Sequence, residues 1–191
     1  MSWLVLGLLI FLGVHSVRLV ADEWRTAQLA RLGEARWKGV YSLVSAVGLG
    51  LIIWGYGQAR GSPVAIWMPA PWTRHLAALL TLPVFVLLVA AYLPRSHIKA
   101  KLGHPMLAGV AFWALAHLLA NGNLADVALF GAFLAWAVAD FVSARRRDRL
   151  AGRTYAVCCW TRDATVVAVG LLIWMLFALW GHAWLIGVMP F

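Results

Sequence analysis

Two histidines lie inside apolar stretches of a chain that contains six histidines in total. His15 lies in "LIFLGVHSVRLV" and His117 lies in "GVAFWALAHLLA". An ionisable side chain in the hydrocarbon of a membrane costs roughly 2–3 kcal/mol even on the mildest scales, so each imidazole needs a partner. One candidate partner is a polar side chain on a neighbouring helix, such as Ser42, Ser45 or Asn121. The other candidate is haem iron, for which histidines on two different transmembrane helices are a familiar pair of axial ligands.

Residues one helical turn from each histidine have types that suit a haem. Arg18 lies three residues after His15 and on the same face of the helix, where its guanidinium could bind a propionate. Trp113 and Ala114 lie four and three residues before His117, where they could place an aromatic wall and a small residue beside a porphyrin. The two segments therefore predict a haem between two helices.

When the depths of the histidines in the membrane are compared, His104 is the alternative to His117 as the second haem ligand beside His15. At about 1.5 Å per residue, His15 lies several Å inside the membrane midplane and His117 a similar distance outside it. His104 precedes Pro105, so it could also be a simple N-terminal residue beside a helix-initiating proline. His104 and His117 are about 140° apart around one helix, which argues against both serving one ligand from one side.

The other three histidines and the two cysteines do not indicate a binding site. His97 lies in a loop, where a solvated side chain is expected. His75 and His182 lie at headgroup depth, where a polar tip reaches water. Cys158 and Cys159 are adjacent, which is a poor geometry for a structural disulfide and not a metal-binding spacing.

The elements that must position these residues are membrane helices. With 63% hydrophobic and only 12% charged residues, the chain has too little polar surface for a soluble core, so residues 1–191 are interpreted as one integral membrane domain surrounded by lipid. The first apolar run lacks a basic n-region and is interpreted as a span, not a cleavable signal. Long apolar runs predict an all-α bundle of about six transmembrane helices, near residues 2–20, 39–57, 75–94, 105–121, 124–142 and 164–187.

The basic residues predict the topology. The first, third and fifth connections contain 14 of the 16 lysines and arginines. By the positive-inside rule these connections face the cytoplasm and both termini lie outside. The net charge of +9 then reflects topology, and no nucleic-acid partner is expected. Residues 21–38 are amphipathic enough to form a helix on the inner membrane surface.

Most of the chain resembles the NnrU family of bacterial membrane proteins. The resemblance is carried by "FLGVHSVRLV", by "RLGEARWKGVYSLVSAVGLGLIIWGYGQAR", by "IKAKLGHPMLAGVAFWALAHLLANGNLADVALFGAFLAWAVAD" and by the terminal "HAWLIGVMPF". The family is associated with nitrite and nitric oxide metabolism in denitrifying bacteria, and it is related to the plastid 15-cis-zeta-carotene isomerase, a membrane haem b protein. The resemblance implies a multi-pass protein of the bacterial inner membrane that binds haem b through His15 and His117.

Two positions depart from the motif of the isomerase. Gly103 stands where an arginine precedes the histidine-proline pair, and Ala114 stands where a cysteine lies three residues before the second histidine. In the mechanism associated with that enzyme, this cysteine can replace the second histidine as a ligand of the iron. A methyl group at position 114 cannot do so.

Three functions are compatible with these residues and this resemblance. The first is a haem enzyme that isomerises, or does redox chemistry on, a hydrophobic polyene reached from the bilayer. The second is a haem-bearing accessory or sensor protein that binds nitric oxide and supports nitrogen-oxide respiration. The third, ranked last, is a small membrane methyltransferase of the isoprenylcysteine type, because a histidine-proline pair also enters a membrane helix there but no cofactor-binding cluster follows it here.

Overall fold

The structure is a computed structural model that describes residues 1–190. The predicted all-α class is confirmed: apart from one antiparallel bridge between Ala65 and Asn123, the regular structure of the described residues is helical. In chain order the helices are α1 (Ser2–Val20), α2 (Asp22–Leu32), α3 (Glu34–Arg60), α4 (Thr73–Tyr92), α5 (His97–Leu102), α6 (Pro105–Ala120), α7 (Leu124–Leu150), α8 (Trp160–Leu176), the π-helical turn η1 (Phe177–Gly181) and α9 (His182–Ile186).

Five helical segments are long and apolar enough to cross a membrane. They are α1, α3, α4, α7 and the continuous segment Trp160–Ile186, which joins α8, η1 and α9. The sixth predicted span is α6, an apolar helix of 16 residues. Its length of about 24 Å is shorter than the roughly 30 Å of bilayer hydrocarbon. The count of six and the sides of the two termini therefore stay predictions.

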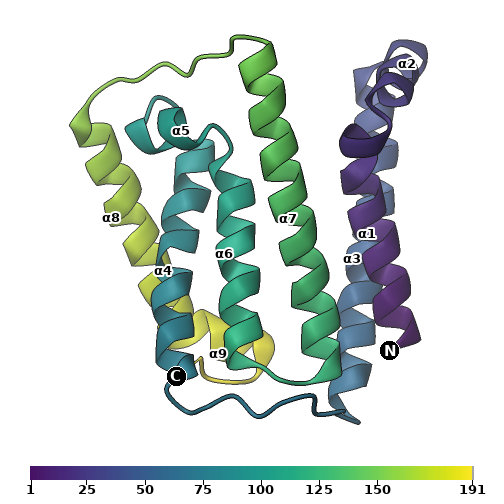
Figure 1. Cartoon of the computed structure of the whole chain (residues 1–191), viewed down its shortest axis with the longest axis vertical. Coiled ribbons are helices and arrows are strands. Elements are labelled where there is room, and N and C mark those ends of the chain that lie inside the picture. Colours follow the sequence, from purple (N-terminus) through teal and green to yellow (C-terminus); the bar gives the residue numbers. More distant parts are fainter. Residues whose placement is uncertain (191) are drawn as a thin grey trace.

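The long helices are arranged in a row (Figure 1). The pair α1 and α3 lies at one side, the group α4, α6 and α8 lies at the other, and α7 lies between them and contacts both α1 and α6. Helices α2 and α5 and the connection from α7 to α8 all lie at one end of the bundle (Figure 1). The three basic connections are thus on the same side of the protein, as the topology requires.

Helices α1 and α3 approach closely because glycines line their contact. A Cβ atom added at Gly7 would lie 2.6 Å from the backbone nitrogen of Ile52, and one added at Gly48 would lie 2.8 Å from the backbone nitrogen of Phe11. Small residues allow such close backbone contact between membrane helices. The close approach brings Tyr41 of α3 against His15 of α1.

The surface helix expected over residues 21–38 is shorter than predicted. It covers only α2, and it ends at Gly33, whose φ of +77° favours a residue without a side chain. Glu34 and Lys38 belong to the first turns of α3 and form an ion pair of 2.6 Å. Acidic residues in the first turn of α2 and Arg31 in its last turn stabilise it through the helix dipole.

The buried core lies where α1, α3, α6 and α7 meet. It is a cluster of apolar side chains: Leu4, Leu8, Ile52, Ala114, Ala125, Leu129 and Phe130. Most other side chains of the long helices are not buried within the protein. In a bilayer, lipid would cover these apolar surfaces, which agrees with the interpretation from composition.

Candidate functional site

The imidazole of His15 has one nitrogen available for a ligand. Its Nδ1 lies 2.6 Å from the carbonyl oxygen of Phe11, one turn earlier on α1. A carbonyl can only accept, so Nδ1 carries the proton and the lone pair lies on Nε2. Hydrogen bonding of one ring nitrogen commonly fixes the tautomer of a metal-binding histidine in this way. Three aromatic rings surround His15: Phe11 at 4.2 Å, Tyr41 at 5.2 Å and Trp136 at 5.8 Å between ring centroids.

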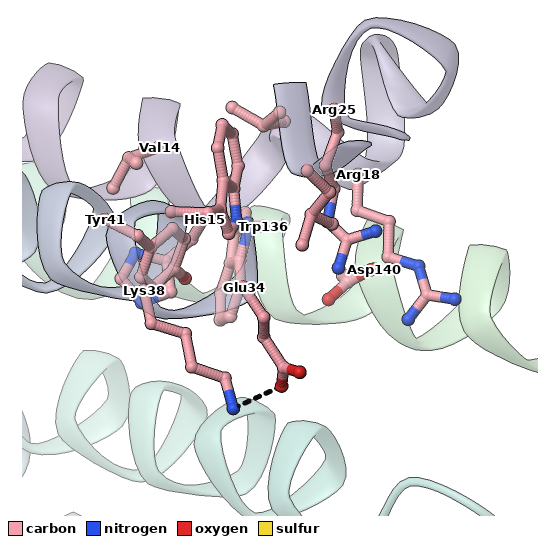
Figure 2. Close-up of a pocket in the computed structure, with 12 residues that line it drawn as sticks. Val14, His15, Arg18, Arg25, Glu34, Lys38, Tyr41, Trp136 and Asp140 are labelled. Atoms are coloured by element: carbon pink, nitrogen blue, oxygen red, sulfur yellow. Dashed lines mark ion pairs between the residues drawn. The ribbon is translucent and has the colours of Figure 1, made fainter. Parts of the chain in front are cut away.

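A cavity of about 420 Å³ opens beside His15 (Figure 2). It lies between α1, α2, α3 and α7, at the basic end of the bundle. Its apolar walls include Val14, Val17 and Leu29, and its polar and aromatic lining consists of His15, Arg18, Arg25, Glu34, Trp37, Lys38, Tyr41, Trp136 and Asp140. The volume is within the range typical of small-molecule and cofactor sites, about 300–1,000 Å³. The cavity therefore combines three cationic groups and two carboxylates with the imidazole of His15.

The two arginines of this cavity are only loosely paired within the protein. Arg18 and Arg25 lie 3.9 Å and 3.8 Å from the same carboxylate oxygen of Asp22, whose side chain is about half exposed (48%). Exposed ion pairs at such distances contribute little to stability, commonly less than about 1 kcal/mol. Both guanidinium groups can therefore turn toward an anionic ligand at small cost.

Two buried polar atoms near His15 have no hydrogen-bond partner within the part of the chain that the structure describes. They are Nε1 of Trp136, whose ring is in contact with His15, and Oγ of Ser45, one turn after Tyr41 on α3. A buried polar group without a partner costs about 1–3 kcal/mol. Both atoms are enclosed by the protein, so they are not exposed to a molecule in the cavity.

The imidazole of His117 has the same internal hydrogen bond but a different surrounding. Its Nδ1 donates to the carbonyl oxygen of Trp113 at 2.8 Å, and its ring stacks on Phe130 at 4.6 Å. Ala114 is fully buried in the core cluster. The hydrogen bonds to neighbouring helices that the sequence suggested for His15 and His117 are not formed among the described residues, because both rings bond within their own helix. The side chain of Asn121 instead donates to the backbone oxygen of His117.

The structure does not bring His15 and His117 together. The ring of His15 lies 5.8 Å from the ring of Trp136, and the ring of His117 lies 4.6 Å from the ring of Phe130; both aromatic residues belong to α7. Phe130 and Trp136 are six residues apart, so the two imidazoles lie about 9 Å apart along the bundle. The two ring nitrogens that bind one metal lie within about 4 Å of each other, since each bond is roughly 2 Å.

His104 is also distant from His15. Its Nε2 donates to the carboxylate of Asp148 at 2.9 Å. Asp148 is twelve residues after Trp136 on α7, which is about 18 Å along the helix. The hydroxyl of Tyr155 donates to the same oxygen at 2.8 Å. Burial and the Asp148 carboxylate raise the pKa of Tyr155, so this hydroxyl remains a donor. His104 is thus part of a polar cluster that joins α6, α7 and the following connection.

This cluster explains why position 103 is a glycine. Gly103 has a φ of +73°, and a Cβ atom there would lie 2.9 Å from the guanidinium of Arg145 and 3.2 Å from the carboxylate of Asp148. An arginine at this position would be strained in its backbone and crowded by both groups. The departure from the isomerase motif is therefore accommodated by the local structure.

The interpretation of His97 as a solvated loop residue is wrong. Its Nδ1 lies 2.6 Å from the carboxylate of Asp163, and its ring stacks on Trp160 at 4.3 Å. These contacts connect α5 to the start of α8.

Of the residues that line this cavity, only His15 and Arg18 were predicted from the sequence as site residues; Arg25, Tyr41, Trp136 and Asp140 are among those that were missed. A signal existed for the last two. Asp140 is an acidic residue near the end of a predicted span, where a charge needs a reason, and it lies one turn after Trp136. Arg25 and Tyr41 gave no such signal, because they belong to other helices than His15.

Several helices of membrane-spanning length, with a histidine and charged side chains around a cavity at one end, define a polytopic membrane protein with a polar cavity. The family described as NnrU protein matches residues 3–190. The chain belongs to the NnrU family. No curated protein and no solved structure matches it.

Proposed function

We propose that this protein of the NnrU family is a membrane haem b protein whose haem occupies the cavity beside His15. The observation that carries the proposal is the imidazole of His15, which has its Nδ1 committed to Phe11 and its other nitrogen available in a cavity lined by Arg18 and Arg25. The iron of a bound haem would supply redox or ligand-binding chemistry that no side chain here provides.

The residues of the cavity fit such a group by chemistry. His15 would provide a nitrogen ligand for the iron, and Arg18 and Arg25 would bind the two propionates. The rings of Tyr41 and Trp136 would pack against the macrocycle.

His117 does not reach this cavity in the packing of the bundle, so His15 would be the one protein imidazole on the iron. A site with one protein ligand leaves room for a small exogenous ligand. This supports the role of a haem-bearing accessory or sensor protein that binds nitric oxide during nitrogen-oxide respiration. The charged lining of the cavity suits propionates better than a long apolar polyene, so we rank the isomerase role second.

The direct test is the absorption spectrum of the detergent-purified protein in its oxidised and reduced states. We expect a haem b spectrum. A purified, folded protein that binds no haem when it is expressed with haem supply would overturn the proposal. A spectrum that changes on addition of nitric oxide would support the accessory or sensor role.

Arg18→Gln tests the contribution of Arg18 to the same cavity. A charge-assisted hydrogen bond is worth roughly 1.5–3 kcal/mol, and exposure of the Arg18 side chain (54%) reduces this value. We expect a dissociation constant for haem about tenfold higher than in the wild type. Arg36→Gln is the matched control, because Arg36 is exposed and does not line the cavity. Equal haem affinity in the two variants would mean that Arg18 does not bind the haem and serves only as a basic residue that sets the membrane topology.

The proposed location is the inner membrane of a bacterium, with the basic end of the bundle in the cytoplasm. Reporter fusions after Arg31 and Arg149 should report the cytoplasm, and fusions after Arg60 and at the C-terminus should report the outside. The spatial grouping of the three basic connections motivates this expectation (Figure 1). A cytoplasmic C-terminus would contradict both the topology and the count of six spans.

A further inference from the structure

Cys158 and Cys159 form an exposed pair of thiols in the connection between α7 and α8. They are the two cysteines of the chain, and both are exposed. Their sulfur atoms lie 3.1 Å apart, within hydrogen-bond distance. The backbone N–H of Cys158 donates to the carbonyl oxygen of Arg95 at 2.9 Å, which fixes the position of this segment against the connection before α5. Both thiols are therefore presented together at the basic end of the bundle.

The geometry of neighbouring residues disfavours a disulfide between these thiols. Adjacent Cα atoms across a trans peptide are about 3.8 Å apart. Disulfide-linked Cα atoms are usually about 4.4–6.8 Å apart, so closing the pair would distort the backbone. The pair also cannot form a structural zinc site, which needs four protein ligands. Among residues 1–190 no group of three or more His, Cys, Asp or Glu side chains could hold a metal ion.

A centre that needs two thiolates and no further protein ligand fits this pair. We propose that Cys158 and Cys159 form a vicinal dithiol site that chelates a trivalent arsenical carrying one organic substituent. The substituent provides the third bond to arsenic, and the two sulfur atoms provide the others. The site is independent of the cavity beside His15.

The surroundings of Cys159 activate it as the first nucleophile. The hydroxyl of Thr161 lies 3.0 Å from its sulfur, and hydrogen bonds from Thr161, from the Cys158 thiol and from the backbone N–H of Arg162 lower the pKa of Cys159 to about 7. The same contact raises the pKa of Cys158, whose proton is shared with Cys159. At neutral pH about half of the pairs therefore contain one thiolate and one thiol.

The reaction conserves the oxidation state of arsenic. The Cys159 thiolate attacks the arsenic of the hydrated reagent, an As–S bond forms and one hydroxide leaves. The Cys158 sulfur then forms the second As–S bond, and its proton leaves with the second hydroxide as water. No electron acceptor is needed.

The probe for this site is phenylarsine oxide, added to the full-length protein in detergent after reduction and removal of the reductant. One equivalent should remove both titratable thiols of each chain and add one phenylarsenic group by mass. The adduct should resist an excess of a monothiol such as 2-mercaptoethanol, and a dithiol such as 2,3-dimercaptopropanol should release it. Chelation by two sulfur atoms explains this difference, because a monothiol must displace both bonds.

The matched controls are Cys158→Ser and Cys159→Ser, each of which retains one thiol. We expect their adducts to be reversed by the monothiol at least about tenfold faster than the wild-type adduct, because only one As–S bond then holds the reagent. Three results would overturn the proposal: loss of only one thiol per arsenical, equal reversal in the wild type and the single variants, or absence of two titratable thiols in the freshly reduced protein.

Discussion

We expect His15→Phe to abolish the haem spectrum and His117→Phe to leave the haem spectrum unchanged. The two variants are matched, because each keeps an aromatic ring of similar size and each loses the bond from Nδ1 to the carbonyl four residues earlier. Only the variant at position 15 removes a ligand from the cavity. The loss should be essentially complete, since a haem without an axial bond is retained only by packing and by its propionates.

The measurement is the haem content per chain of each purified variant, together with its reduced-minus-oxidised spectrum. Size-exclusion elution checks that each variant is folded. His15→Gly supplemented with free imidazole adds a second readout, because the small ligand can enter the space left by the ring and restore the spectrum. His75→Phe is a control in the first turn of α4, away from the cavity beside His15.

Loss of haem in both phenylalanine variants would contradict the separation of α1 from α6 by α7. It would mean that one iron binds both imidazoles, as the resemblance to the isomerase implies. The bundle would then have to bring together rings that are about 9 Å apart along its axis. If haem were lost only in a His104 variant, His104 would be the iron ligand, as the comparison of depths suggests.

The second large effect concerns turnover: we expect no isomerisation of 15-cis-zeta-carotene by the wild-type protein. The isomerase motif has a cysteine at the position of Ala114, and the methyl group here cannot bind iron. Ala114 is fully buried among apolar side chains and does not line the cavity beside His15. Met106 is about two helical turns away on α6, too far to take the place of that cysteine.

Co-expression with the carotenoid substrate, followed by chromatography of the isomers, measures this activity. The variant Ala114→Cys is the matched test, because it restores the sulfur with an expected packing cost of about 1–3 kcal/mol. We expect it to remain inactive and to have the same iron ligands in both oxidation states, since position 114 lies in the core. Robust isomerisation by the wild type would contradict the proposed role. A ligand change on reduction in Ala114→Cys would place the iron near α6 instead of His15.

The sequence by itself determined the class of the protein and most of its helices. Long apolar runs have few conformational solutions in lipid, since every backbone polar group must be satisfied within a helix. This is why the predicted spans lie within or close to α1, α3, α4, α6, α7 and α8. Pro105 also marked the first residue of α6, whereas the break at Gly33 between α2 and α3 was not predicted.

The tertiary structure decided which polar side chains meet, because such contacts join residues far apart in the chain. Periodicity placed Arg18 on the face of His15, but it could not show that Arg25, Tyr41 and Trp136 complete the same cavity. Depth counting placed His15 and His117 on opposite sides of the midplane, and only the contacts of their rings with Trp136 and Phe130 on α7 gave the separation between them. The pairing of His104 with Asp148 and of His97 with Asp163 depends in the same way on how the helices pack. The sequence of a single helix does not predict which neighbouring helix it will contact.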